Sequence, residues 1–169
     1  MRDEQYVSFR IDEHLFGINI LTVREIIRNV EITPVERSPE SVRGLLNLRG
    51  QIITVLDLGP SLGLPLRTLG AGTRCVIIKT ADEVAGLIEE GALSEEMFGE
   101  AVGLVVDGIS DVVEIDEDEL ESPPANANGL NCEHLKGVVK LESKLLLVLA
   151  LRKLVEEGMH GQVAGAVAD

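Results

Sequence analysis

The sequence has few aromatic residues and little positive charge. Of its 169 residues, three are Phe, one is Tyr and none is Trp. Asp and Glu number 29 against 15 Lys and Arg, which gives a net charge of −14. Nucleic-acid-binding proteins need basic surfaces and rings that stack on bases, and this charge repels phosphate backbones and anionic membranes. The composition therefore predicts a protein that neither binds nucleic acid nor inserts directly into a membrane.

Long hydrophobic runs and a secretion signal are also missing. The longest strongly apolar run, from Leu145 to Leu151, has seven residues, whereas a membrane-spanning helix needs about 20. The chain opens with the polar residues Arg2, Asp3 and Glu4 after Met1, which does not resemble a signal peptide. We therefore expect a soluble protein of the cytoplasm.

Residue patterns that carry chemistry are scarce. Two Cys and three His are too few for a disulfide framework or a structural zinc site, and Cys75, in an apolar run, is expected to be a buried thiol. The acidic run at residues 114–121 lacks the Gly and the ligand spacing of a calcium loop, so we expect a solvated turn there. No phosphate-binding loop or nucleophile motif is present, although a triad assembled from distant residues would leave no motif. The sequence predicts a non-enzymatic protein without catalytic residues, cofactor or metal.

The residues that are present predict strands. Apolar residues make up 45% of the chain and the mean hydropathy is +0.20, which excludes a disordered acidic chain. Alternating polarity predicts a hairpin from a strand at 6–11, a polar turn at 12–14 and a second strand through 16–20. Further strands are expected at residues 51–58, 74–80, 100–106, 137–141 and 144–151.

Two helical elements are expected beside the strands. Val23, Ile26 and Ile27 have helical spacing, which predicts a short amphipathic turn at residues 22–28. A longer helix is predicted at residues 151–157, followed by a flexible tail at 158–169.

The chain contains an internal repeat. The segment around Gly44 aligns with that around Gly137, and the segment around Gly17 aligns with that around Gly103. This predicts two small β units of about 70 residues, neither of which is large enough to bury a core alone. We expect them to pack together as small barrels, with an insertion in the second unit at residues 81–99.

Residues 42–58, VRGLLNLRGQIITVLDL, resemble the hallmark of the CheW family of chemotaxis coupling proteins. Agreement extends to FGINI at 16–20, VREI at 23–26, ITPV at 32–35 and VGLVVDGI at 102–109. The resemblance covers a single CheW-like domain at about 6–157. It implies a mainly β fold of two SH3-like five-stranded β-barrels packed together, with short helices and a C-terminal helix. The barrels are expected at approximately 6–66 and 74–150, and an exchange of strands between them is left open.

The resemblance also implies a function. Such a protein is a non-enzymatic adaptor that couples the cytoplasmic tips of methyl-accepting chemoreceptors to the regulatory domain of the histidine kinase CheA. It would be cytoplasmic and recruited to receptor arrays. The alternative is a CheW-like regulatory module of another chemosensory or kinase pathway, without direct receptor coupling.

By the same resemblance, an apolar groove between the barrels binds the receptor, and the kinase meets the barrel ends. Arg49 in the 47–50 turn is expected to form a salt bridge with Glu25, which we place on the short helical element; the alternative is that both are simply exposed. The predicted partner-binding residues are Val23, Glu25, Ile27, Asn47, Leu48, Arg49, Gly50 and Val76.

Residues 81–99 depart from the family pattern, in which a tight hairpin stands at this place. The apolar residues of this segment predict a small helical lid, and the alternative is a contact surface of its own. These residues are Val84, Leu87, Ile88, Met97 and Phe98.

Overall fold

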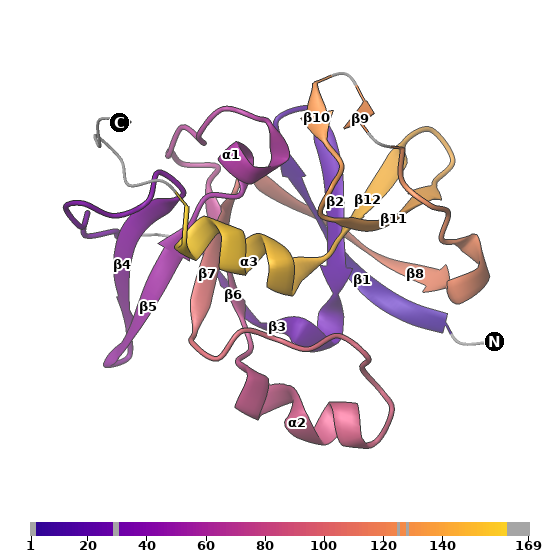
Figure 1. Cartoon of the computed structure of the whole chain (residues 1–169), viewed down its shortest axis with the longest axis horizontal. Coiled ribbons are helices and arrows are strands. Elements are labelled where there is room, and N and C mark those ends of the chain that lie inside the picture. The colour runs from indigo at the N-terminus through magenta and orange to yellow at the C-terminus, as the bar shows by residue number, and fades with distance from the viewer. Residues whose placement is uncertain (1–2, 29–30, 125, 128, 162–169) are drawn as a thin grey trace.

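Two five-stranded sheets make up most of the fold (Figure 1). A computed structural model of the chain describes residues 3–28, 31–124, 126–127 and 129–161. The first sheet has the order β11 (Leu135–Lys140), β12 (Leu145–Leu149), β2 (His14–Asn19), β1 (Asp3–Ile11) and β8 (Gly108–Asp116). The second sheet has the order β3 (Val23–Ile27), β6 (Arg74–Ile78), β7 (Val102–Val106), β5 (Gln51–Leu56) and β4 (Val42–Leu48). The predicted mainly β fold is confirmed.

Short elements connect and cover these sheets. Strands β9 (Asn126–Ala127) and β10 (Leu130–Asn131) form a small two-stranded sheet. The α-helices are α1 (Gly59–Leu62), α2 (Ala81–Glu89) and α3 (Leu151–Met159), and the 3₁₀ helices are η1 (Ile20–Thr22) and η2 (Glu117–Glu119).

The β1–β2 hairpin follows from the alternation that predicted it. Its two strands pair antiparallel from Tyr6 opposite Asn19 to Ile11 opposite His14. Asp12 in the turn has a φ of +56°, a conformation that Asp tolerates better than most side chains. Phe9 and Phe16, which are opposite each other in the register, are both fully buried. The hairpin therefore places one apolar face in the core.

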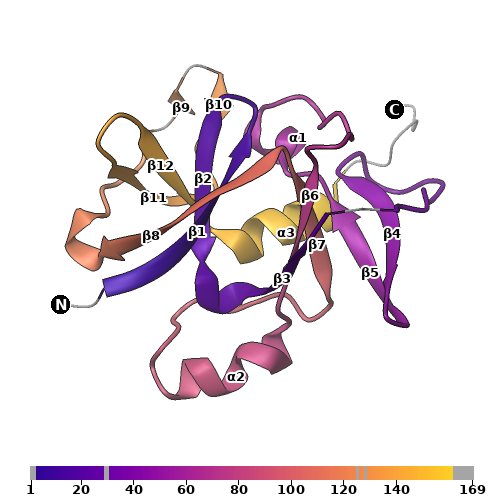
Figure 2. The ribbon, with the colours of Figure 1, turned by 180° about the vertical axis from the view of Figure 1, so that it is seen from behind.

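Each sheet contains strands from both halves of the chain. Strand β12 pairs with β2 in parallel, and β5 pairs with β7 in parallel. These two parallel pairs connect hairpins that lie far apart in the sequence, as the colours in Figure 2 show. Residues 6–66 and residues 74–150 therefore both contribute strands to both sheets. Units of this size bury a smaller share of their surface alone than one larger domain does, and the exchange of strands lets the two halves share one interior.

The repeat has a direct structural counterpart at two glycines. Gly17 on β2 pairs with Val148, and Gly103 on β7 pairs with Val55. A Cβ atom at Gly17 would lie 3.0 Å from Leu146 Cδ1, and one at Gly103 would lie 2.5 Å from Cys75 Sγ. Both glycines therefore allow a close approach at equivalent positions of the two parallel pairs.

One large apolar cluster joins the two sheets. It includes Phe9 and Phe16 from the first sheet, Leu56 and Leu104 from the second, and Leu154 from α3. Burial of apolar side chains is the main stabilising contribution to a fold of this kind. The shared cluster therefore makes the two sheets one folding unit.

The helical turn predicted at residues 22–28 is wrong. A 3₁₀ helix ends at Thr22, and Val23–Ile27 form strand β3, which pairs antiparallel with β6. Glu25 therefore lies on a strand. The segment is too short to form a stable helix alone, and its β-branched residues Val23 and Ile27 favour pairing with β6.

The acidic run at residues 114–121 is also more ordered than a solvated turn. Glu114 to Asp116 continue β8 and pair with β1, so that Asp116 lies opposite Asp3. Asp116 then caps η2 in a capping box with Glu119. Backbone pairing at the edge of the first sheet therefore overrides the polar character of these residues.

Residues 81–99 contain the predicted helix. Thr80 and Glu83 form a capping box at the start of α2, and Val84 is fully buried. Leu93 and Met97 belong to the large apolar cluster. The segment packs on the core as the lid interpretation expects.

The C-terminal helix extends past its predicted end to Met159, so Gly158 and Met159 do not belong to a flexible tail. Residues 160 and 161 of the expected tail follow the helix as a bend, and residues 162–169 lie outside the described residues. Cys75 is fully buried, as predicted, and burial raises the pKa of its thiol to about 12.

Candidate protein-binding surface

The tip of the β4–β5 hairpin is a two-residue turn formed by Arg49 and Gly50. Leu48 pairs with Gln51 across the turn, and φ is +51° at Arg49 and +87° at Gly50. Positive φ at both central residues is the geometry of a type I′ turn, which matches the twist of the strands on either side. Asn47 Oδ1 accepts a hydrogen bond from Gly50 N at 2.9 Å, which fixes the turn. Arg49 is therefore held at an exposed tip.

Arg49 forms the predicted ion pair with Glu25 of β3. Arg49 Nη1 lies 3.4 Å from Glu25 Oε2, and Nη2 donates to Oε1. The Arg49 side chain is 70% exposed and that of Glu25 is 28% exposed. The hydrogen bond to Glu25 and the charge of this carboxylate raise the pKa of Arg49. The pair therefore presents a fixed, charged fork on the surface.

Arg24, the neighbour of Glu25, makes the next polar contacts along β3. Arg24 Nη1 donates to Gln51 Oε1 at 2.8 Å, and Nε donates to Glu83 Oε2 at 3.1 Å. Strands β3 and β4 are the two edges of the second sheet. Contacts from Arg24 and Glu25 to the β4–β5 hairpin tip therefore connect these edges through side chains.

Exposed apolar side chains also occur on the strands that carry these charged residues. Ile52 is 59% exposed and pairs with the exposed Asn47 in the β4–β5 register. Ile26, next to Glu25 on β3, is 39% exposed. Sequence reasoning missed Ile52 because the predicted 51–58 strand is apolar on both faces, and it missed Ile26 because the predicted helical turn assigns this residue to its apolar side. We call the residues Glu25, Asn47, Arg49 and Ile52 the hairpin-tip surface, and Ile26 is not part of it because it points to the opposite face of β3 from Glu25.

The predicted groove residues do not all lie at the surface. Val23 and Ile27 are half-buried, as is Leu48. Val76 has no exposed surface and belongs to the large apolar cluster. Its place as a lining residue is therefore corrected, because Val76 lies on β6, between β3 and β7, and its side chain packs in the cluster that both sheets share. The structure brings Glu25 together with the turn residues and leaves Val76 in the interior.

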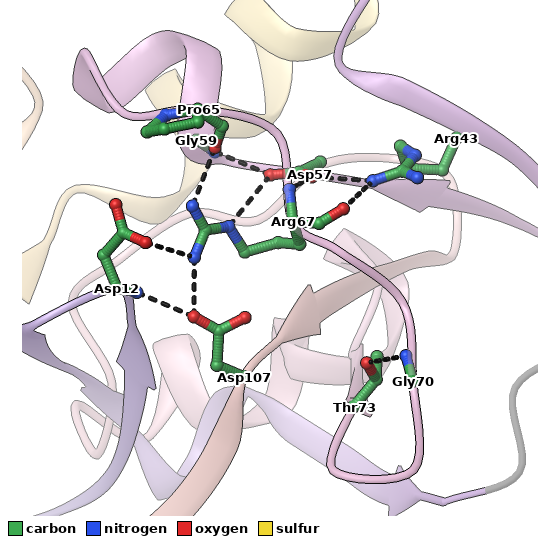
Figure 3. A network of polar contacts seen from close by, with 9 residues as sticks. All are labelled: Asp12, Arg43, Asp57, Gly59, Pro65, Arg67, Gly70, Thr73 and Asp107. Carbon is green, nitrogen blue, oxygen red and sulfur yellow. Dashed lines mark hydrogen bonds and ion pairs between the residues drawn. The ribbon is translucent and has the colours of Figure 1, made fainter.

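A second polar cluster, which sequence reasoning did not find, surrounds Asp57 after β5 (Figure 3). Asp57 is fully buried. Its Oδ1 accepts from Gly59 N at 2.9 Å, and its Oδ2 accepts from Arg67 N at 2.6 Å and from Arg43 Nη1 at 3.0 Å. These donors satisfy a carboxylate that would otherwise be costly to bury.

Arg67 connects this carboxylate to the other sheet. Its Nη1 donates to Asp107 Oδ2 at 2.6 Å and to Asp12 Oδ1 at 3.3 Å, and Nη2 donates to Pro65 O at 2.8 Å. Burial alone would lower the pKa of Arg67. The hydrogen bonds to Asp12 and Asp107 and the negative charges of these carboxylates raise it by a larger amount, so the pKa lies above its ordinary value. The cluster ties the β1–β2 turn to the end of β5 and has a structural role.

Within the described ranges, no group of three or more His, Cys, Asp or Glu side chains is placed to hold a metal ion. Among the helices of those ranges, none is both long and apolar enough to cross a membrane.

Comparison with known proteins identifies the family. The sequence model of the CheW-like domain matches residues 5–159. The chemotaxis protein CheW of Treponema pallidum is 31% identical over 156 residues, which cover 91% of this chain and 84% of that protein. CheW of Thermotoga maritima is 27% identical over 157 residues, 93% of this chain and 91% of that protein.

A solved structure shows the same fold. The scaffolding protein CheW of Thermoanaerobacter tengcongensis superposes with a TM-score of 0.73 at 28% identity, covering 91% of this chain and 88% of that chain. This match confirms the expected pair of SH3-like subdomains. The chain belongs to the CheW family of chemotaxis proteins, which are scaffolds and not enzymes.

Proposed function

We propose that this protein is a cytoplasmic adaptor that couples the tips of methyl-accepting chemoreceptors to the histidine kinase CheA in receptor arrays. Membership of a scaffold family supports an adaptor role. An adaptor acts by holding two partners in a fixed geometry, so it needs separate binding surfaces on a rigid body. The core shared by both sheets supplies that rigidity.

The observation that carries this proposal is the hairpin-tip surface. It combines the exposed Ile52 with the Arg49–Glu25 ion pair. An exposed apolar side chain next to a fixed Arg, surrounded by polar residues, is typical of protein–protein contact sites. The turn geometry at Arg49 and Gly50 holds the fork in place before binding, which reduces the entropy lost on association.

The two partners are proposed to use different faces. The receptor would contact the groove beside β3, where Val23 and Ile27 are half-buried and flank Glu25. The regulatory domain of CheA would meet the ends of the barrels through pseudo-symmetric pairing, in which similar surfaces of the two proteins face each other. A receptor movement would then reach the kinase through one rigid connection.

A capture experiment tests this proposal. The tagged protein is mixed with a receptor-tip fragment and with CheA, and both partners are expected to be retained. Ile52→Glu should weaken retention, because it places a charge at the apolar position of the hairpin-tip surface. Val112→Glu is the matched control, since Val112 is similarly exposed, at 53%, but lies on β8 of the first sheet.

The outcomes separate the proposal from its alternative. Retention of both partners, weakened by Ile52→Glu alone, supports the adaptor. Retention of a kinase without any receptor would instead favour a regulatory module of another pathway. Retention of neither partner would overturn the proposed function.

A further inference from the structure

Helix α3 begins without a cap of its own. The residue before it is Ala150, which has no side chain able to cap, and the first turn contains no acidic residue. The first N–H groups of a helix have no partner inside the helix, and a helix of nine residues is only marginally stable alone. Something outside α3 must therefore stabilise its N-terminus.

Residues 94–97 supply the missing cap. Glu95 Oε1 accepts a hydrogen bond from Leu151 N at 2.8 Å. Glu96 forms an ion pair with Arg152. A carboxylate at a helix N-terminus also interacts favourably with the helix dipole. A segment more than fifty residues away in the sequence thus performs the work of a local N-cap.

The segment that carries Glu95 is anchored on both sides of it. Met97 and Leu93 are buried in the large apolar cluster. Near the start of the 81–99 segment, Glu83 of α2 forms an ion pair with Arg24 of β3. The position of Glu95 is therefore supported by contacts other than its own hydrogen bond to α3.

Helix α3 in turn connects the two sheets. It follows β12 of the first sheet directly, and its residues Leu151, Leu154 and Val155 are buried in the apolar cluster that both sheets share. It also contacts β5 of the second sheet and α1. Figures 1 and 2 show the helix running between the two groups of strands.

We propose that residues 81–99 form a strap that fastens α3 by supplying its N-terminal cap through Glu95, and thereby holds the two sheets together. The strap is an internal support of the scaffold and does not depend on the proposed partners. The groups that face Glu95 are Lys136 of β11, Glu4 of β1 and the backbone of α3. Burial raises the pKa of Glu95, and the hydrogen bond from Leu151 partly opposes that shift.

Hydrogen exchange of the backbone amides of α3 in the full chain tests the strap. In Glu95→Ala, amides from Leu154 to Met159 are expected to exchange about fivefold faster, which corresponds to loss of a cap worth about 1 kcal/mol. Glu95→Gln should exchange more slowly than Glu95→Ala and closer to the wild type, because its amide oxygen accepts the same hydrogen bond although it lacks the charge that interacts with the helix dipole. Glu89→Ala is the matched control, since Glu89 is an exposed residue of the same segment.

The exchange of β12 distinguishes local from global effects. The strap predicts that Glu95→Ala accelerates exchange in α3 more than in β12, because the helix opens first. Unchanged exchange in α3 would overturn the proposal. Equal acceleration in α3 and β12 would also overturn it, because α3 would then open only when the whole protein unfolds. Neither result bears on binding of CheA or receptors.

Discussion

Glu25 on β3 and Arg49 at the β4–β5 turn form an ion pair that connects the two edges of the second sheet. The pair is too exposed to contribute much to stability. Its effect is geometric, because the carboxylate holds a guanidinium that would otherwise be free at the tip of a hairpin. This arrangement places a charged fork beside Ile52 on a rigid turn.

Replacement of Arg49 should reduce the coupling of CheA to receptors without much loss of folding stability. In Arg49→Ala, the melting temperature is expected to stay within a few degrees of the wild type, because the pair is exposed. Coupling of CheA activity to receptors should be strongly reduced. Arg49→Lys should restore it only in part, because an ammonium group lacks the fork.

Arg10→Ala provides the control, because Arg10 is an exposed Arg on β1 of the other sheet. The measurements are thermal unfolding and receptor-dependent kinase activity of the reconstituted complex. A variant that loses coupling only in proportion to lost stability would show that Arg49 is structural.

The Asp57 cluster makes the opposite prediction. Arg67→Ala removes a nearly buried cation that contacts Asp12 and Asp107, and it takes the guanidinium charge away from the fully buried Asp57, whose Oδ1 lies 3.9 Å from Arg67 Nε. The free energy of unfolding should fall by about 3 kcal/mol or more. Urea denaturation measures this change. Arg74→Ala is the comparison, because Arg74 donates only to nearby backbone carbonyls, and its replacement should cost about 1 kcal/mol or less.

The close contact at Gly103 is testable through Cys75. Gly103→Ala adds a methyl group that meets Cys75 Sγ, and overpacking of this kind costs about 1–3 kcal/mol. Gly17→Ala should cost less, because the atoms it meets belong to the flexible end of Leu146. In Cys75→Ala combined with Gly103→Ala, the cost of the glycine replacement should decrease. A cost that is independent of residue 75 would show that another neighbour, such as Ile77 Cδ1, and not Cys75 Sγ limits this position.

The Arg24–Glu83 pair predicts how stability responds to acid. The hydrogen bond from Arg24 lowers the pKa of Glu83 below its ordinary value of 4.5, against the effect of burial. Because the folded-state pKa is the lower one, the contribution of Glu83 is fully present above pH 4.5 and is lost as the pH falls through the folded-state pKa. Glu83→Gln should therefore be less stable than the wild type at neutral pH, and the difference should shrink in acid. A difference that does not change with pH would contradict the assigned ion pair.

Local patterns in the sequence predicted most elements of the fold. Alternating polarity around Phe9 and Phe16 gave the first hairpin, because burial of one strand face leaves a two-residue period. The repeat located Gly17 and Gly103 at equivalent positions, where the structure has equivalent parallel pairs. The charges of Glu25 and Arg49 predicted a pair that the structure confirms.

Features that depend on contacts between distant segments were missed. Val23 to Ile27 form a strand only because β6 lies beside them, and no pattern within five residues records that neighbour. Asp57 and Arg67 stand out only when four separate segments meet around them. The family resemblance placed Val76 in the groove, whereas the strand order places it in an inner strand with its side chain buried. Tertiary pairing therefore decides what local periodicity cannot.

Sedimentation of CheA with receptor-containing membranes tests the adaptor role most directly. CheA is mixed with these membranes in the presence and absence of this protein, and the fraction of kinase in the pellet is measured. We expect CheA to enter the pellet when the wild-type protein or Val112→Glu is present, and much less of it with Ile52→Glu. An equal fraction of CheA in the pellet with and without this protein would contradict the account.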